Sequence, residues 1–398
     1  MNICFVEFGY PTKNSGGGAG TYVKITAKEL LKQGHKVFVI SKYFPDESEE
    51  FIDEGIFIKR IKIKGWHWYF IKIPFIGKIL ARFFSIIEYS AAINSTIKKL
   101  HKKYTLDLVE FSETANFLYL FQIKLPYVVH LHGSSFTFKK YCGEKITLED
   151  RLQRKLEGIF MKKSKLITSP SKFLKKEIIN EFKINESKIK VIPHPVNDYL
   201  LTLSYKQKYN FKIVFYAGRL EKRKGVHILK ESIPIIVKEY PNVKFWLFGS
   251  ESEEITRKDL AEYFRNHNVI NNVELYPFLK RDKMLKFLKE SDICVVPSLW
   301  DNSPLIIYES MILGKAIVAS NVGGIPELII NNFTGILVEA GNIKEFSNAI
   351  IKLLFNRDTC QTIGRKAQEF AIQMFNINKI VSRRLEIYKN LLKENNFL

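Results

Sequence analysis

The stretch FKIVFYAGRLEKRKG, residues 211–225, joins an apolar run to a glycine and then to a cation-rich loop. The run predicts a buried strand of a sheet wound with helices, and ligands of such sheets bind outside the carboxyl ends of the strands. Because Arg219 and Lys224 lie in the loop, we predict that they hold a diphosphate, one as a bidentate donor and the other as a point charge. A solvated basic loop is the alternative, and it suits Lys222 and Arg223.

Downstream, the stretch VPSLWDNSP at 296–304 leads from another apolar run into a second helix. Ser303 is predicted as the N-cap and Pro304 as the first helical residue, so that amides of the first turn point toward a ligand. Asp301 precedes this helix and Glu309 lies within it, a spacing that lets two carboxylates bind hydroxyls on different parts of one ligand. Alternatively, Asp301 is a capping acid and Glu309 a surface residue.

Short β-branched runs alternate with helical patterns along nearly the whole chain, which indicates an α/β protein with parallel sheets. At 398 residues the chain is too long for one core, and the pattern restarts after Pro193-His194-Pro195. We therefore predict two Rossmann-like domains facing a cleft, residues 1–195 and 196–375, with a last helix at 376–398 packing back on the first domain. The predicted strands are 3–8, 36–41, 106–111, 127–132, 165–168, 211–217, 243–248, 273–276, 293–296 and 316–319.

Two further elements of the first half lie at predicted strand ends. Gly17 and Gly18 belong to the glycine-rich segment 15–20, which lets a backbone approach a phosphate or sugar, or else forms a simple turn. The segment is not a dinucleotide fingerprint, because Thr21 stands where the third glycine is needed. His132 ends an apolar run, and we favour it over His130 for function because it adjoins a loop, whereas His130 can be a core histidine.

The formal net charge of +21 predicts attraction to polyanions. The excess peaks between Lys59 and Arg82, where cations alternate with aromatic residues and no acid occurs. This segment, about 59–84, is predicted to lie on an anionic membrane surface, and a strand plus a helix with solvated lysines is the alternative. We expect no nucleic-acid partner, because no zinc-finger, RNP or helix-turn-helix pattern accompanies the charge.

The start of the sequence lacks the features of a signal peptide, and the four scattered cysteines suit reduced thiols, so a cytoplasmic location on the inner face of the membrane is expected. We also expect no metal and no cofactor, because two cations can stabilise a leaving diphosphate and no Asp-x-Asp pair is present.

Together these motifs resemble the retaining, nucleotide-sugar-dependent glycosyltransferases of family 4, which have the GT-B fold. The family's Pro-Ser and E-x7-E type pattern falls on Pro297, Ser298, Asp301 and Glu309, and 314–320 and 323–327 follow in the family's order. The resemblance implies that a hexose-type sugar moves from a nucleotide diphosphate, most commonly UDP, to an acceptor, here expected to be a lipid-linked or cell-surface glycan.

The resemblance also implies a role for each matching residue. Arg219 and Lys224 would hold the diphosphate, and Glu309 the ribose. Asp301 would meet the sugar hydroxyls, and His132 would lie near the reaction centre. The remaining donor contacts would come from Gly17, Gly18, Leu279 beside the base, and the amides of Ser303, Leu305 and Ile306.

Asp301 stands where the family has Glu, which shortens its reach to the sugar. Two other functions fit the same scaffold. One is a nucleotide-sugar epimerase, which needs no acceptor, and the other is a basic membrane-binding protein without catalysis, whose affinity would not depend on Arg219.

Overall fold

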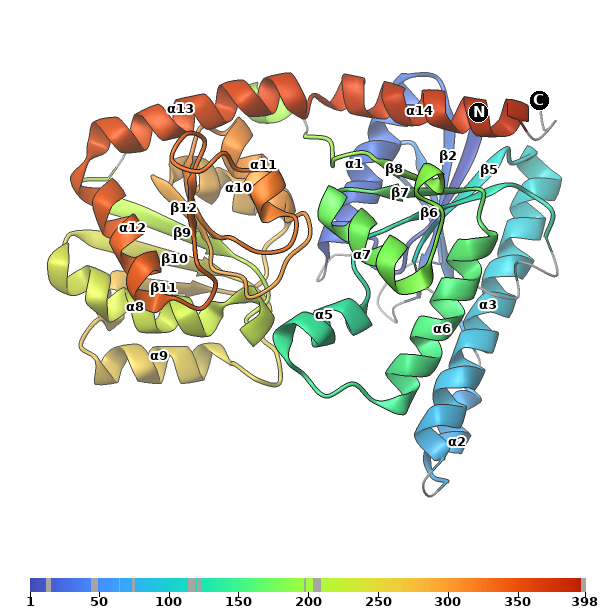
Figure 1. Cartoon of the computed structure of the whole chain (residues 1–398), viewed down its shortest axis with the longest axis horizontal. Coiled ribbons are helices and arrows are strands. Elements are labelled where there is room, and N and C mark those ends of the chain that lie inside the picture. The colour runs from blue at the N-terminus through green and yellow to red at the C-terminus, as the bar shows by residue number, and fades with distance from the viewer. Residues whose placement is uncertain are drawn as a thin grey trace. The chain divides into compact units, whose positions relative to one another are not determined.

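The computed structural model describes residues 1–11, 16–43, 49–63, 65–73, 76–113, 119, 123–196, 198–202 and 209–394. One compact unit is built from the described residues of 1–193 and 378–398, and a second from those of 194–377. Each has its own sheet of mainly parallel strands covered by helices, so both are Rossmann-like, as predicted (Figure 1).

The described part of the first unit contains an eight-stranded sheet in the order β3-β4-β2-β1-β5-β6-β7-β8. Neighbouring strands run parallel except β3 and β4, which form an antiparallel pair at one edge. The strands are β1 (Asn2–Val6), β2 (Lys36–Lys42), β3 (Glu50–Asp53), β4 (Ile56–Ile61), β5 (Leu108–Ser112), β6 (Tyr127–His130), β7 (Leu166–Ser169) and β8 (Ile189–Val191).

Alternating residues of the central strands face opposite helical layers. On β5, Val109 and Phe111 pack into an apolar cluster with residues of α3 (Gly77–Tyr104), α6 (Leu148–Lys163) and α7 (Lys172–Phe182). Between them, Glu110 points to the other face, toward α1 (Gly18–Lys32) and α14 (Ile377–Glu394). The last helix of the chain thus packs on the first unit, as the sequence predicted. A short helix, α5 (Ser135–Cys142), precedes α6.

A helical hairpin extends from the first unit. Figure 1 shows α2 (His67–Ile71) at the far end of α3, away from the strands. The stacked rings of Phe70 and Phe84, 4.1 Å apart, hold the two helices together, and His67 Nδ1 lies 2.5 Å from a carboxylate oxygen of Glu88. Within the described parts of the chain, none of the helices has the length and apolar character needed to cross a bilayer.

The described part of the second unit contains a six-stranded parallel sheet in the order β11-β10-β9-β12-β13-β14. Its strands are β9 (Lys212–Ala217), β10 (Val243–Phe248), β11 (Val273–Tyr276), β12 (Ile293–Val296), β13 (Ala316–Ser320) and β14 (Ile336–Val338). One face is covered by α8 (Val226–Glu239), α9 (Arg257–Asn266) and α12 (Ile343–Phe355), the other by α10 (Arg281–Glu290), α11 (Leu305–Ile312) and α13 (Arg357–Met374).

Candidate active site

Lys224 follows β9 in a short 3₁₀ helix, Lys222–Lys224, whose position is fixed by the backbone around it. Gly225 ends this turn at a φ of +70°, and a Cβ there would collide with the carbonyl of Pro297. The amide of Leu299 donates to the carbonyl of Arg223 at 2.9 Å. The loops after β9 and β12 are therefore locked together at the carboxyl ends of neighbouring strands, where a wound sheet binds ligands.

Asp301 lies in the second of these loops and forms an ion pair with Lys224. Lys224 Nζ donates to Asp301 Oδ2 at 2.5 Å, while the amide of Asn302 donates to Oδ1 at 3.0 Å. Gly323, at a φ of +56°, packs so closely on the carbonyl of Asp301 that a Cβ would not fit, so the residue cannot shift freely. The structure thus brings together the predicted phosphate-binding lysine and the predicted sugar-binding carboxylate.

These two residues line a small depression in the second unit, together with Pro304 and Ile306 at the start of α11. Pro304, and not Ser303, is the N-cap, because Pro304 has an extended ψ of 120° and the helix begins at Leu305. The predicted cap at Ser303 is therefore wrong by one residue. The Ser303 hydroxyl hydrogen-bonds instead to the Tyr308 hydroxyl at 2.7 Å. First-turn amides of a helix have no intrahelical partner, so those of Leu305 and Ile306 are suited to bind an anion.

Glu309 lies one turn further along α11 and is only 3% exposed, so the surface alternative for it is wrong. Its carboxylate contacts the guanidinium of Arg281, the first residue of α10. Burial raises the pKa of Glu309, and Arg281 opposes that rise. Leu279, the predicted neighbour of the base, precedes α10 and packs against the apolar cluster beneath α10 and α11. Sequence patterns did not indicate Arg281, because 28 residues separate it from Glu309 and no motif contains both.

Arg219 is placed differently from Lys224. Its side chain is 61% exposed and its ion-pair partner is Glu221, at 3.3 Å. Arg223 also pairs with Glu221, at 2.6 Å, so the solvated-loop alternative does not describe that residue fully. The two cations of the proposed clamp thus have different carboxylate partners, and only Lys224 lies in the depression beside Asp301.

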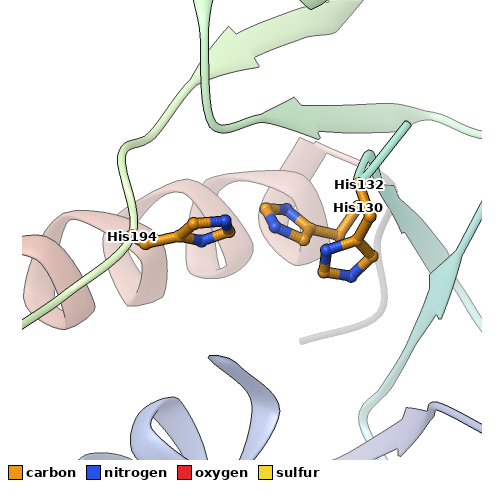
Figure 2. Close-up of side chains that lie close together, drawn as sticks. All are labelled: His130, His132 and His194. Carbon is orange, nitrogen blue, oxygen red and sulfur yellow. The ribbon is translucent and has the colours of Figure 1, made fainter. Parts of the chain in front are cut away.

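His132 lies just beyond β6 in the first unit, and Figure 2 shows its ring beside that of His130. His130 is the core histidine: it is 1% exposed, and its Nδ1 lies 2.7 Å from Thr168 Oγ1. Tyr22 stacks on His130 and meets the edge of His132, at centroid distances of 4.3 and 5.5 Å. His194, also drawn in Figure 2, opens the second unit, where its ring lies 5.9 Å from that of Tyr308.

Burial, and secondarily the charge of Arg384, lowers the pKa of His132 to about 3, so its ring is neutral near pH 7. The His132 amide donates to Glu113 Oε2 at 2.5 Å, which fixes the backbone beside the ring. A neutral imidazole has one donor nitrogen and one acceptor nitrogen, and it carries no positive charge.

Gly17 and Gly18 lie at the beginning of α1, with Gly17 as the N-cap. A Cβ built on either glycine would have open space around it, so the backbone at this helix start is accessible. Gly20, by contrast, packs directly on the carbonyl of Gly9, which explains that glycine by packing alone. Ser15 lies outside the described residues.

Comparison with known proteins agrees with this architecture. The family model of glycosyltransferase family 4 matches residues 16–199, and that of the glycosyl transferases of group 1 matches residues 204–370. An uncharacterised glycosyltransferase of Methanocaldococcus jannaschii is 24% identical over 98% of both chains.

Solved structures are similar over almost the whole chain. Sucrose-phosphate synthase from Thermosynechococcus elongatus has a TM-score of 0.80 at 19% identity, covering 99% of this chain and 100% of that one. The Anabaena protein HepE, solved with UDP and glucose, has a TM-score of 0.72 at 19% identity, covering 98% and 100%.

Two Rossmann-like units, with the last helix packed on the first, are the architecture of the GT-B fold. The chain belongs to the glycosyl transferases of group 1. The family assignment made from the motifs is therefore confirmed, and the protein is a transferase of sugars.

Proposed function

We propose that this glycosyltransferase takes a hexose from a nucleotide diphosphate, UDP in the first instance, and transfers it with retention of anomeric configuration. The second unit would bind the donor and the first unit the acceptor. The observation that carries the proposal is the Lys224–Asp301 pair, a cation and a carboxylate 2.5 Å apart beside the start of α11. The ammonium group of Lys224 and the helix amides can bind a diphosphate, and the carboxylate of Asp301 can accept hydrogen bonds from sugar hydroxyls.

Departure of the diphosphate leaves negative charge on the oxygen that was bonded to the sugar. Lys224 and the amides of Leu305 and Ile306 are fixed where that charge would develop, and Arg219 could join them by leaving Glu221. Loss of one such preorganised donor costs about 3 to 4 kcal/mol at the transition state. These groups can stabilise the negative charge that a metal ion would otherwise stabilise, so we propose that transfer is independent of a metal ion. The acceptor would attack the face of the sugar that the leaving group occupied.

UDP as the donor nucleotide is supported by the Anabaena relative, whose structures contain UDP and UDP-glucose. A binding panel tests the donor: UDP, GDP, ADP and their glucose conjugates are titrated calorimetrically into the protein. Lys224→Met is expected to weaken nucleotide binding at least tenfold, whereas Lys222→Met, its neighbour, serves as the matched control. No binding of any nucleotide to the wild type, or equal effects of both variants, would refute the donor site.

Activity tests separate the alternatives. Incubation with the bound sugar nucleotide and a mixture of lipid-linked and free glycans should yield a new glycosidic bond of the donor's anomeric configuration, in EDTA as well as with Mg²⁺. A new sugar epimer without acceptor would identify an epimerase. An inverted product would refute retention, and activity lost in EDTA would refute metal independence.

We further propose that the protein binds the inner face of the cell membrane through the α2–α3 hairpin, which fits a lipid-linked acceptor. Its tip exposes large apolar side chains near Lys72 and Lys78: Trp66, Trp68, Tyr69, Ile71, Ile73 and Ile76. Trp and Tyr favour the headgroup layer, and each lysine adds about 1 kcal/mol at an anionic surface.

The structure narrows the segment predicted to meet the membrane. Arg60 lies in β4 and is 1% exposed, while Lys59 and Lys62 pair with Glu49 on the neighbouring edge. The strand alternative therefore holds for this part, and the membrane surface that we propose is restricted to residues 66–84.

A further inference from the structure

The Glu309 carboxylate is a buried anion on α11, the helix whose first turn lines the depression beside Lys224. Its side chain is 4% exposed, and its Oε1 contacts the guanidinium of Arg281. Arg281 is the first residue of α10, so its backbone is fixed by a helix, while its side chain remains 29% exposed. Two different helices, α11 and α10, thus bring a carboxylate and a guanidinium together.

A carboxylate in this position stays ionised only if a cation compensates for its burial. Burial raises the pKa of Glu309, and the charge of Arg281 lowers it. The other titratable group facing Glu309 is the thiol of Cys294 on β12, whose pKa burial raises to about 12, so it stays neutral. Among the residues that the structure describes, Arg281 is therefore the charge that keeps Glu309 an acceptor.

We infer that Arg281 is a positioning residue for the donor nucleoside: it holds the Glu309 carboxylate ionised and oriented, so that the ribose hydroxyls can donate to it. The inference rests on the proposed donor site. Two vicinal hydroxyls that donate to a charged carboxylate are recognised strongly, and a site built in this way rejects analogues that lack them. Arg281 would then determine both the affinity for ribonucleotides and its dependence on pH.

The test uses UDP and 2′,3′-dideoxyuridine diphosphate, titrated calorimetrically into the full chain at pH 6, 7 and 8.5. Arg281→Leu is expected to weaken UDP binding about tenfold at pH 7, because Glu309 then takes up a proton. The ratio of variant to wild-type Kd should shrink as pH rises, since the protonation of UDP itself cancels in the ratio. Arg281→Lys should restore much of the affinity, and Arg365→Leu, which breaks an exposed pair with Glu369, should change nothing.

A double-mutant cycle shows whether Arg281 acts through Glu309. In the Glu309→Gln background, Arg281→Leu should change UDP affinity by less than about twofold, because the charge that it supports is gone. The wild type should prefer UDP over the dideoxy analogue by about tenfold or more, and Arg281→Leu should largely lose this preference.

Several results would overturn the inference. They are unchanged UDP affinity in folded Arg281→Leu, an equal loss in the Glu309→Gln background, or a preference for the ribose hydroxyls that Arg281→Leu leaves intact. If Arg281→Leu does not fold, Arg281→Gln takes its place, because it also removes the charge, and a purely structural arginine would give a ratio that does not change with pH. A wild type that binds no nucleotide would instead remove the donor site itself, which distinguishes failure of the proposed function from failure of this inference.

Discussion

Replacement of Asp301 by asparagine is expected to separate donor affinity from turnover. Asp301 Oδ2 accepts a hydrogen bond from Lys224 Nζ at 2.5 Å. A diphosphate arriving at Lys224 must therefore compete with this carboxylate and meets its negative charge as well. Asp301→Asn removes both obstacles and keeps the side chain's shape, so UDP without a sugar should bind more tightly.

The size of the expected gain in UDP affinity follows from how exposed the Lys224–Asp301 ion pair is. The Lys224 and Asp301 side chains are 24% and 11% exposed, so the pair lies between a surface ion pair and a buried one. Surface pairs contribute about 0 to 1 kcal/mol, and loss of one partner of a buried pair costs about 3 to 5 kcal/mol. An intermediate value of about 1 to 2 kcal/mol corresponds to a gain in UDP affinity of roughly 5- to 30-fold.

Turnover should change in the opposite direction. The sugar's hydroxyls lose a charged acceptor worth about 1.5 to 3 kcal/mol, so kcat with the complete donor should fall roughly 10- to 150-fold. Calorimetry with UDP and initial rates with the sugar nucleotide measure the two effects. Asp358→Asn, at an exposed position of α13, is the control for loss of one negative charge. UDP binding that weakens in Asp301→Asn, or that tightens equally when Lys224 is already methionine, would refute the reasoning.

Three further predictions concern the first unit. Trp68 and Tyr69 are 65% and 80% exposed. The double variant Trp68→Ser/Tyr69→Ser should bind less well to vesicles containing anionic lipid in a flotation assay, with no decrease in Tm. Unchanged vesicle binding would refute the proposed membrane surface. Arg384→Met should destabilise the protein by about 3 to 5 kcal/mol, because it leaves the buried Glu110 carboxylate without its cation. In the double variant Arg384→Met/Glu110→Gln, Tm should recover partly, and no recovery would contradict the pairing. Burial raises the pKa of Glu113 to about 8, so the stability that its protonation adds to the folded state is complete below pH 4.5 and is lost as pH rises to 8. In denaturant titrations, the free energy of unfolding of the wild type should therefore fall by up to about 1.4 kcal/mol per pH unit in this range relative to Glu113→Gln. The same pH dependence in both proteins would contradict this prediction.

The sequence predicted the central strands well because they are continuous apolar runs. The prediction for β10, β11 and β12 matches the observed bounds at both ends. It omitted the edge strands β3, β8 and β14, and also β4 beside β3, since short or half-exposed strands have weak patterns. In β4, Lys59 and Arg60 lie side by side among apolar residues, and these charges concealed a strand that ends within the predicted membrane segment.

The candidate site was most predictable where its residues lie in loops that follow apolar runs. Lys224, Asp301 and His132 do so, and the structure places them beyond the carboxyl ends of β9, β12 and β6. What the sequence could not reveal is which charges pair. Lys224 and Asp301 are 77 residues apart, and Arg384 pairs with Glu110 across 274 residues. Such pairings are set by strand order, which no local pattern specifies.

The pairings have a common consequence for the proposed donor site. Lys224 is held by Asp301, and Arg281 by Glu309, so each cation has an anion as its partner within the protein. Buried charges that are paired in this way avoid most of the cost of an unpaired charge in a low-dielectric site. Donor binding then becomes an exchange of partners, in which diphosphate replaces Asp301 at Lys224 while ribose hydroxyls are added at Glu309. Since this exchange is short-range, donor affinity should depend far less on salt concentration than membrane binding by the basic hairpin, whose charges face water.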